Sequence, residues 1–153
     1  MLKNIQIIIL SIVMICGVFV FTYLNQKSET SNNFDHYTLS LKGVNIKHIL
    51  ASTAETRVKG LSGMESLPKD TVMFFVFDVP DKYGIWMKDM KFPIDIIWLD
   101  QEGRVITLES NVFPDTFPKV FFPLENSLYT VEANSGFIDQ NQLEVGSFFS
   151  ITK

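Results

Sequence analysis

Two ionisable side chains, Lys88 and Asp95, lie among large apolar residues in the segment 84–105. A charge on a buried face costs several kcal/mol unless it is paired. The segment therefore either anchors an internal salt bridge or lines a polar site. Arg57 is the expected partner of Asp95, because its planar guanidinium can hold a carboxylate with two hydrogen bonds. Lys88 is the second choice.

Strand alternation predicts that Asp95 is buried. It would share a face with Ile97 and Leu99, while the neighbouring residues form an equally apolar second face. Glu132, between Val131 and Ala133, is another acid in apolar surroundings. Together with Asp95 it could perform acid–base chemistry if the two lay close together.

Two interpretations of these charges stand side by side. In the first, they form a buried ion pair that fixes the strand register, and spacing alone favours this one, since structural ion pairs also bury charge. In the second, they line a ligand pocket in which Arg57 meets an anion and Trp86 forms an aromatic wall.

Composition excludes several other kinds of site. The net charge is −4 and no basic run is present, so nucleic acid is not an expected partner. The single cysteine, Cys16, lies in an apolar N-terminal run, which leaves the rest of the chain without thiol chemistry. His36 and His48 lack metal-ligand spacing, and the methionines are typical core residues. We therefore expect no metal and no cofactor.

The N-terminus predicts a membrane anchor. Residues 5–24 are uncharged and apolar all round, and at about 1.5 Å per residue they would span roughly 30 Å of hydrocarbon. No small-residue cleavage site follows, so we expect residues 1–25 to be a retained anchor and not a cleaved signal sequence. Residues 26–33 are expected to be a polar tether. Lys3 before the span favours a single pass through the cytoplasmic membrane, with the C-terminal part outside the cytoplasm.

The remaining residues, 34–153, are predicted to form one mainly β (α+β) domain, a small antiparallel barrel or sandwich with one short helix. Strands are expected at 37–41, 46–51, 72–79, 85–88, 94–99, 104–109, 128–133 and 147–152. The helix should begin after Thr53, with Ala54, Val58 and Leu61 on its apolar face and Arg57 at the border. Residues 111–124 hold three prolines and four phenylalanines, which predicts a long loop folded over part of the domain.

An ordered set of short motifs resembles the domain of unknown function 192 family of small exported or membrane-anchored prokaryotic proteins. The motifs are Glu55-x-Arg57-x-x-Gly60-Leu61, Met73-Phe-Phe-Val-Phe77, Trp86-Met87-Lys88, Pro93-Ile-Asp95-Ile96, Asp100-x-x-Gly103-x-Val105 and Val131-Glu132-Ala133-x-x-Gly136. The resemblance implies a compact, mainly β fold with a short helix, and no established activity, cofactor or substrate.

By position, the resemblance places the family's characteristic residues at Arg57, Trp86, Met87, Lys88, Asp95 and Glu132. Ser62, Val72 and the pair Asp89-Met90 depart from its pattern. The resemblance implies a shared site near Arg57, Trp86 and Asp95.

Three functions follow as hypotheses. The first is a membrane-tethered binding or accessory module for a small ligand or an envelope protein. The second is a hydrolase-like enzyme that uses Asp95 or Glu132 with Arg57. The third is an interaction domain that docks through the Phe-rich loop 113–122. A deep pocket at Arg57 would favour the first, two carboxylates within reach of each other the second, and a flat aromatic patch without a pocket the third.

Overall fold

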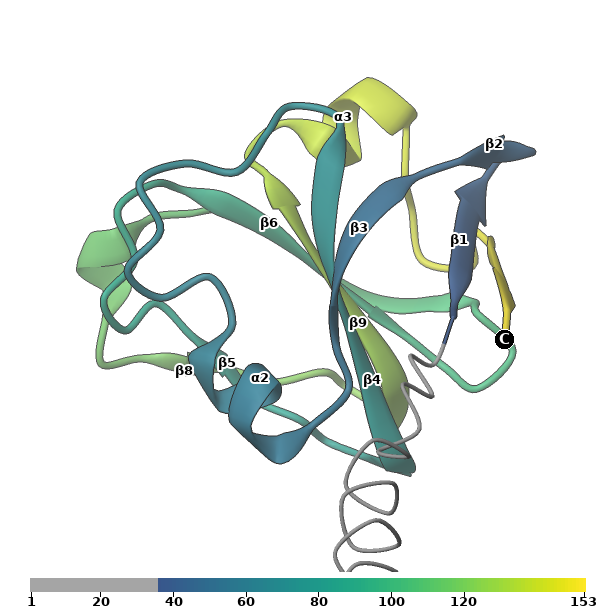
Figure 1. Ribbon diagram of the computed structural model, residues 1–153, viewed down its shortest axis with the longest axis horizontal. Helices are drawn as coiled ribbons and strands as arrows, with labels where there is room; N and C mark the ends of the chain where they lie inside the picture. Colours follow the sequence, from purple (N-terminus) through teal and green to yellow (C-terminus); the bar gives the residue numbers. More distant parts are fainter. Residues whose placement is uncertain (1–35) are drawn as a thin grey trace, which may run out of the picture. The chain divides into compact units, whose positions relative to one another are not determined.

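The computed structural model describes residues 36–153 (Figure 1). The predicted anchor and tether lie outside these residues. Within the described part of the chain, no helix is both long enough and apolar enough to cross a membrane. Residues 37–153 form one compact unit.

Ten strands, two short α-helices and one 3-10 turn make up the described residues. They are β1 (Thr38–Leu41), β2 (Val44–Asn45), β3 (Lys47–Ala51), α2 (Ala54–Lys59), β4 (Thr71–Asp81), β5 (Ile85–Trp86), β6 (Ile94–Leu99), β7 (Val105–Val112), η1 (Pro114–Thr116), β8 (Val120–Phe121), β9 (Ser127–Asn134), α3 (Phe137–Asn141) and β10 (Phe149–Thr152).

A five-stranded sheet in the order β3-β4-β9-β6-β7 forms the centre of the domain. Its pairs are antiparallel except for β3 and β4, which run parallel and are joined through α2. The sheet is open, so the prediction of a barrel is wrong. A three-stranded sheet, β10-β1-β2, and a two-stranded sheet, β5-β8, complete the fold. The mainly β class is confirmed, although the described residues contain two short helices instead of one.

The three-stranded sheet covers one face of the central sheet. Leu39 of β1 and Phe149 of β10 are fully buried against Phe74, Ile97 and Val131 of the central strands. Helix α3 closes the end of this cluster through Ile138. The arrangement is a small sandwich, in which each sheet buries one apolar face against the other.

The other face of the central sheet carries a second apolar cluster. Phe75, Ile96 and Trp98 pack there against Met87 and against Phe121 of β8. The strand predicted at 85–88 therefore does not continue the central sheet, because β5 pairs only with β8. In Figure 1, α2, β5 and β8 lie on one side of the central sheet, and β1 and β2 lie on the other.

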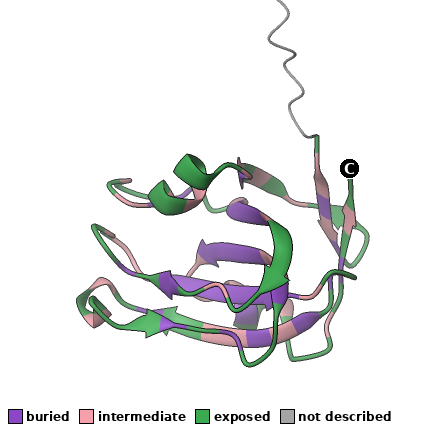
Figure 2. Ribbon diagram, turned by 90° about the horizontal axis from the view of Figure 1, so that it is seen from below, coloured by how far each residue is buried: buried purple, intermediate pink, exposed green. Residues whose placement is uncertain are grey.

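Helix α2 begins as predicted but does not bury the predicted face. Val58 is 74% exposed, and no residue of the helix is buried (Figure 2). The helix is too short to bury that face, because it ends at Gly60, which has a positive φ of 48°. Leu61 is buried only after the chain has turned. The helix thus borders the second face of the central sheet without burying any of its own residues.

Candidate ligand-binding pocket

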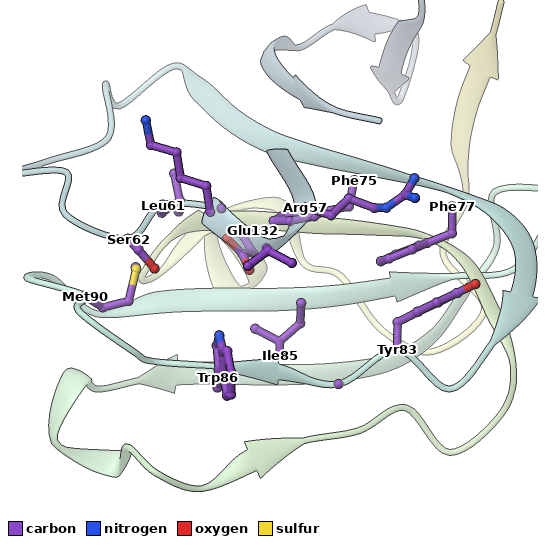
Figure 3. Close-up of a pocket in the computed structure, with 14 residues that line it drawn as sticks. Arg57, Leu61, Ser62, Phe75, Phe77, Tyr83, Ile85, Trp86, Met90 and Glu132 are labelled. Atoms are coloured by element: carbon purple, nitrogen blue, oxygen red, sulfur yellow. The ribbon is translucent and has the colours of Figure 1, made fainter. Parts of the chain in front are cut away.

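A pocket of about 220 Å³ opens between α2, β4, β9 and the segment that leads into β5 (Figure 3). Its lining mixes aromatic, aliphatic and ionisable side chains. The lining residues are Arg57, Val58, Lys59, Gly60, Leu61, Ser62, Phe75, Phe77, Tyr83, Gly84, Ile85, Trp86, Met90 and Glu132.

Arg57 is anchored in the pocket wall by the protein itself. Its Nη1 donates to the carbonyl oxygens of Ser52 at 2.7 Å and Val76 at 2.8 Å, and its Nη2 donates to Asp78 Oδ2 at 3.0 Å. The guanidinium also lies 5.5 Å from the centre of the Phe77 ring. These bonds tie α2 to β4, so Arg57 is a structural clamp as well as a lining residue.

The start of α2 fixes the position of Arg57. The side chain of Thr53 accepts a hydrogen bond from the Thr56 N–H, and the Thr56 hydroxyl accepts one from the Thr53 N–H. This reciprocal pair is a capping box, which satisfies donors that a helix start leaves free.

A ring stack forms the far wall of the pocket. The Phe77 and Tyr83 rings lie 3.5 Å apart at an angle of 4°. The Tyr83 hydroxyl donates to the Val79 carbonyl at 2.8 Å, while the Tyr83 carbonyl accepts from the Trp98 indole at 2.9 Å. Burial raises the pKa of Tyr83, and nearby Asp81 adds to the rise. The wall is therefore held in place by contacts within the protein.

Glu132 is the buried acid of this pocket. On β9 it lies opposite Met73 of β4 and Ile96 of β6, so its side chain points to the second face. It is only 5% exposed, and among the described residues nothing donates a hydrogen bond to its carboxyl group or pairs with it. Burial raises the pKa of Glu132 to about 8. Figure 3 shows it between Ser62 and Met90 on one side and Phe77 and Tyr83 on the other.

Asp95 does not belong to this pocket, and the predicted ion pair with Arg57 or Lys88 is wrong. Its carboxylate is fully buried and accepts hydrogen bonds from the backbone N–H of Asn111 at 2.8 Å and of Ile138 at 2.9 Å. Ile138 lies in the first turn of α3, where free N–H groups favour an anion. Because strand residues alternate, Asp95 faces the first cluster and Glu132 the second.

The three neighbouring residues Trp86, Met87 and Lys88 have different positions. Trp86 lines the pocket, is 47% exposed and meets Phe117 edge-on at 6.4 Å. Met87 is a core residue of the second cluster. The Lys88 ammonium lies 5.8 Å from the centre of the Trp86 ring, and Lys88 does not line the pocket. Of the six candidate residues, the structure brings Arg57, Trp86 and Glu132 together.

Two of the departures from the family pattern lie at the pocket. Ser62 donates its hydroxyl to the Lys88 carbonyl at 2.8 Å, which joins the loop after α2 to the loop after β5. Met90 lines the pocket, and the residue before it, Asp89, has a positive φ of 56°. A flexible thioether at this position adds apolar surface to the pocket.

Sequence reasoning missed the rings of Phe75, Phe77 and Tyr83 as lining residues. Alternation along β4 was a usable signal for the first two, because Phe75 and Phe77 must share a face. Tyr83 lies in the connection between β4 and β5, and its stacking on Phe77 follows from a chain reversal that no local pattern marked.

A second cavity of about 260 Å³ lies beside α3 and is lined by Lys69, Asn134, Ser135, Phe137 and Gln140. None of these side chains is buried. It is larger but lacks a buried ionisable group, so it gives weaker grounds for a binding site.

Comparisons with known proteins place the fold. None of the curated proteins compared with this chain matches it. A crystal structure of a protein of unknown function from Novosphingobium aromaticivorans DSM 12444 is similar, with a TM-score of 0.67 and 23% identity over 74% of this chain and 82% of that one. A proposed transcription regulator from Sinorhizobium meliloti 1021 is similar too, with a TM-score of 0.68 and 21% identity over 74% of this chain and 90% of that one.

At these identities, the two structures establish the fold alone. The family model described as "DUF192: Uncharacterized ACR" matches residues 37–151, which is most of the chain and all of the central sheet. The match includes every motif on which the resemblance rested. The chain therefore belongs to the domain of unknown function 192 family.

Proposed function

We propose that residues 37–153 form a binding module that holds a small molecule in the pocket beside α2. The observation that carries this proposal is Glu132, a buried carboxyl group that faces the pocket without a protein partner among the described residues. Leaving such a group unpaired costs about 1 to 3 kcal/mol or more, a cost that a bound ligand can remove. Binding sites in proteins combine this kind of polar group with apolar walls.

The preformed walls support the same proposal. Arg57 is held by three hydrogen bonds, and Tyr83 is locked by its stack and its hydroxyl bond. A site that is rigid before binding loses little conformational entropy when the ligand arrives.

A blocking variant tests the proposal. Val58 lines the pocket from the exposed side of α2, so Val58→Trp should fill the opening. Val44→Trp is the matched control, because Val44 is similarly exposed but lies on β2. In a ligand-observed NMR screen of small aromatic molecules on the full chain, we expect hits that Val58→Trp removes and Val44→Trp retains. Hits that survive Val58→Trp, or no hits at all, would overturn the proposal.

The geometry does not favour the hydrolase hypothesis. Asp95 and Glu132 point to opposite faces of the central sheet, so they cannot act on one substrate as an acid–base pair. Arg57 and the Tyr83 hydroxyl are already committed to protein carbonyl groups and to Asp78.

Exposed rings in the loop 113–122 support a second candidate function, the docking of an envelope protein. Phe113, Phe117 and Phe122 are about half exposed, and Trp86 adjoins Phe117. Exposed apolar side chains gathered in one place are typical of interaction sites. Replacing Phe113 by Ser should weaken cross-linking to a partner and leave ligand binding in the pocket unchanged, because Phe113 does not line the pocket. Unchanged cross-linking would exclude this surface.

We further propose that residues 5–24 tether the module to the cytoplasmic membrane with the domain outside. The support is the length and apolarity of that run. Fractionation of cells that express the full chain should place it, uncut, with the membranes. Soluble extracytoplasmic protein shortened by about 25 residues would show a cleaved signal sequence instead.

A further inference from the structure

We propose that the pocket selects a ligand with a carbonyl oxygen, and that the carboxyl O–H of Glu132 donates a hydrogen bond to that oxygen. This inference rests on the proposed function and specifies the chemistry of its ligand. The ligand class is a single-ring or branched apolar molecule that carries an amide or carboxylic acid group.

Burial, and not the charge of its neighbours, favours an uncharged Glu132. The other charged lining residues, Arg57 and Lys59, are cations, which by themselves favour an ionised carboxylate. The charge of Arg57 is already paired with Asp78 at 3.0 Å, and burial outweighs the rest. The strand residues beside Glu132, Met73 and Ile96, have no titratable group.

The remaining titratable neighbour is Tyr83, whose hydroxyl is already bonded to a backbone carbonyl. Burial raises the pKa of Glu132 to about 8, so its carboxyl group is mostly protonated at neutral pH. A neutral carboxyl group offers one O–H donor.

A cationic ligand fits this pocket poorly. It would require Glu132 to ionise in a desolvated position, and both charges would lose their hydration for one ion pair. It would also approach Lys59, which carries the same sign, while the Arg57 charge is already paired with Asp78. The Phe77 ring is already stacked on Tyr83 and lies 5.5 Å from the Arg57 guanidinium.

Volume and lining set the size of the ligand. The pocket measures about 220 Å³. An apolar cavity of about 150 Å³ holds benzene. There is thus room for one ring and one polar substituent, with Leu61, Phe75, Ile85 and Met90 around the ring and Glu132 at the substituent.

Three probes of similar size separate the possibilities: benzamide with a carbonyl acceptor, benzylamine with a cation, and ethylbenzene with no polar group. Their dissociation constants are measured on the full chain by NMR titration. At about pH 6, benzamide should bind most tightly. At about pH 9, one unit above the pKa of Glu132, its apparent affinity should fall about tenfold, because only the protonated form donates.

Two variants make the test specific to Glu132. Glu132→Gln keeps a donor of the same shape, so benzamide should still bind and its affinity should no longer change between the two pH values. Glu132→Leu removes the donor, and the preference for benzamide over ethylbenzene should disappear. Val58→Trp should weaken all three probes.

The contradicting outcomes are distinct. If benzylamine binds more tightly than benzamide, Glu132 acts as an anion and the inference is wrong, while the binding module stands. Equal binding of ethylbenzene and benzamide, or benzamide affinity that does not fall with pH, also overturns the inference alone. If none of the three probes binds at millimolar concentration, both the inference and the proposed function fail.

Discussion

At the scale of single residues, the two buried acids have opposite environments although they lie on neighbouring strands. Asp95 receives two backbone N–H donors, one of them from the first turn of α3. Glu132 receives none among the described residues and opens onto the pocket. The pairing of Ile96 with Glu132 explains the difference, because it puts the two acids on opposite faces of the sheet. The Asp95 carboxyl group joins elements of the fold, and the Glu132 carboxyl group has no partner among the described residues, as the proposed binding site requires.

Removing the Asp95 carboxylate should destabilise the domain strongly. Asp95→Ala leaves the buried N–H of Ile138 and the part-buried N–H of Asn111 without an acceptor, which should cost about 2 to 5 kcal/mol in urea unfolding. Because Arg57 shares no partner with Asp95, the losses in Asp95→Ala and Arg57→Ala should add within about 0.5 kcal/mol. A double variant much more stable than this sum would show that the two residues are coupled after all.

Glu132 should make stability depend on pH. Its carboxyl group ionises near 4.5 in the unfolded chain and near 8 in the folded one. Between these values the folded state binds more protons, so the unfolding free energy falls as pH rises, by at most about 1.4 kcal/mol per unit. Glu132→Gln removes this dependence and should be more stable than the natural chain at pH 8, with a smaller difference near pH 5. If the unfolding free energies of the natural chain and of Glu132→Gln differ by the same amount at every pH, Glu132 is not a lone buried acid.

At the scale of elements, the capping box of α2 is the feature that holds the pocket rim in place. Six residues are too few for a helix to persist by its own propensity, so its start and its Arg57 clamp must hold it. Thr53→Ala removes the hydrogen bond to the Thr56 N–H and should cost about 1 kcal/mol of unfolding free energy. Ser150→Ala, at an exposed position of β10, is the control and should cost less than half as much. Equal losses would mean that the cap contributes nothing.

Elements with a local signal could be predicted from the sequence, and those held by distant contacts could not. The alternating residues of β1 are a local signal of a strand, and Thr53 is a local signal of the start of α2. Helix α3 has no side-chain cap of its own. The N–H of Ile138 in its first turn donates instead to the carboxyl group of Asp95, which lies 43 positions away in the sequence. The short strand β8 lies within residues 111–124, which were expected to form a long loop, and its pairing with β5 likewise depends on a distant contact.

At the scale of the whole molecule, the central sheet separates two apolar clusters, and only one of them borders the pocket. Phe74 belongs to the cluster beneath the three-stranded sheet, and Phe75 belongs to the cluster on the pocket side. The sequence predicted that Arg57 and Trp86 lie near each other, with Glu132 among the six candidate residues, and the structure places all three at one pocket. The sequence could not separate Asp95 from them, since that required knowing which face of the sheet each acid occupies.

Substitutions at the adjacent residues Phe74 and Phe75 should separate the effect on stability from the effect on ligand affinity. Phe74→Leu and Phe75→Leu should each cost about 1 to 3 kcal/mol of unfolding free energy, because both rings are fully buried. Only Phe75→Leu should change ligand affinity, since Phe75 lines the pocket and Phe74 does not. Circular dichroism melts and NMR titration with benzamide measure the two effects. Equal effects on affinity would mean that the faces are not independent.

The most direct test of the account is the ionisation of Glu132 itself. Carbon-13 NMR of the glutamate side-chain carboxyl groups, with Glu132→Gln to identify the signal, follows its titration in the full chain. The account predicts a midpoint near 8, far above the ordinary value of 4.5, because the group is buried without a protein partner. A midpoint near 4.5 would contradict it, since the carboxylate would then be either solvated or already paired and would not be waiting for a ligand.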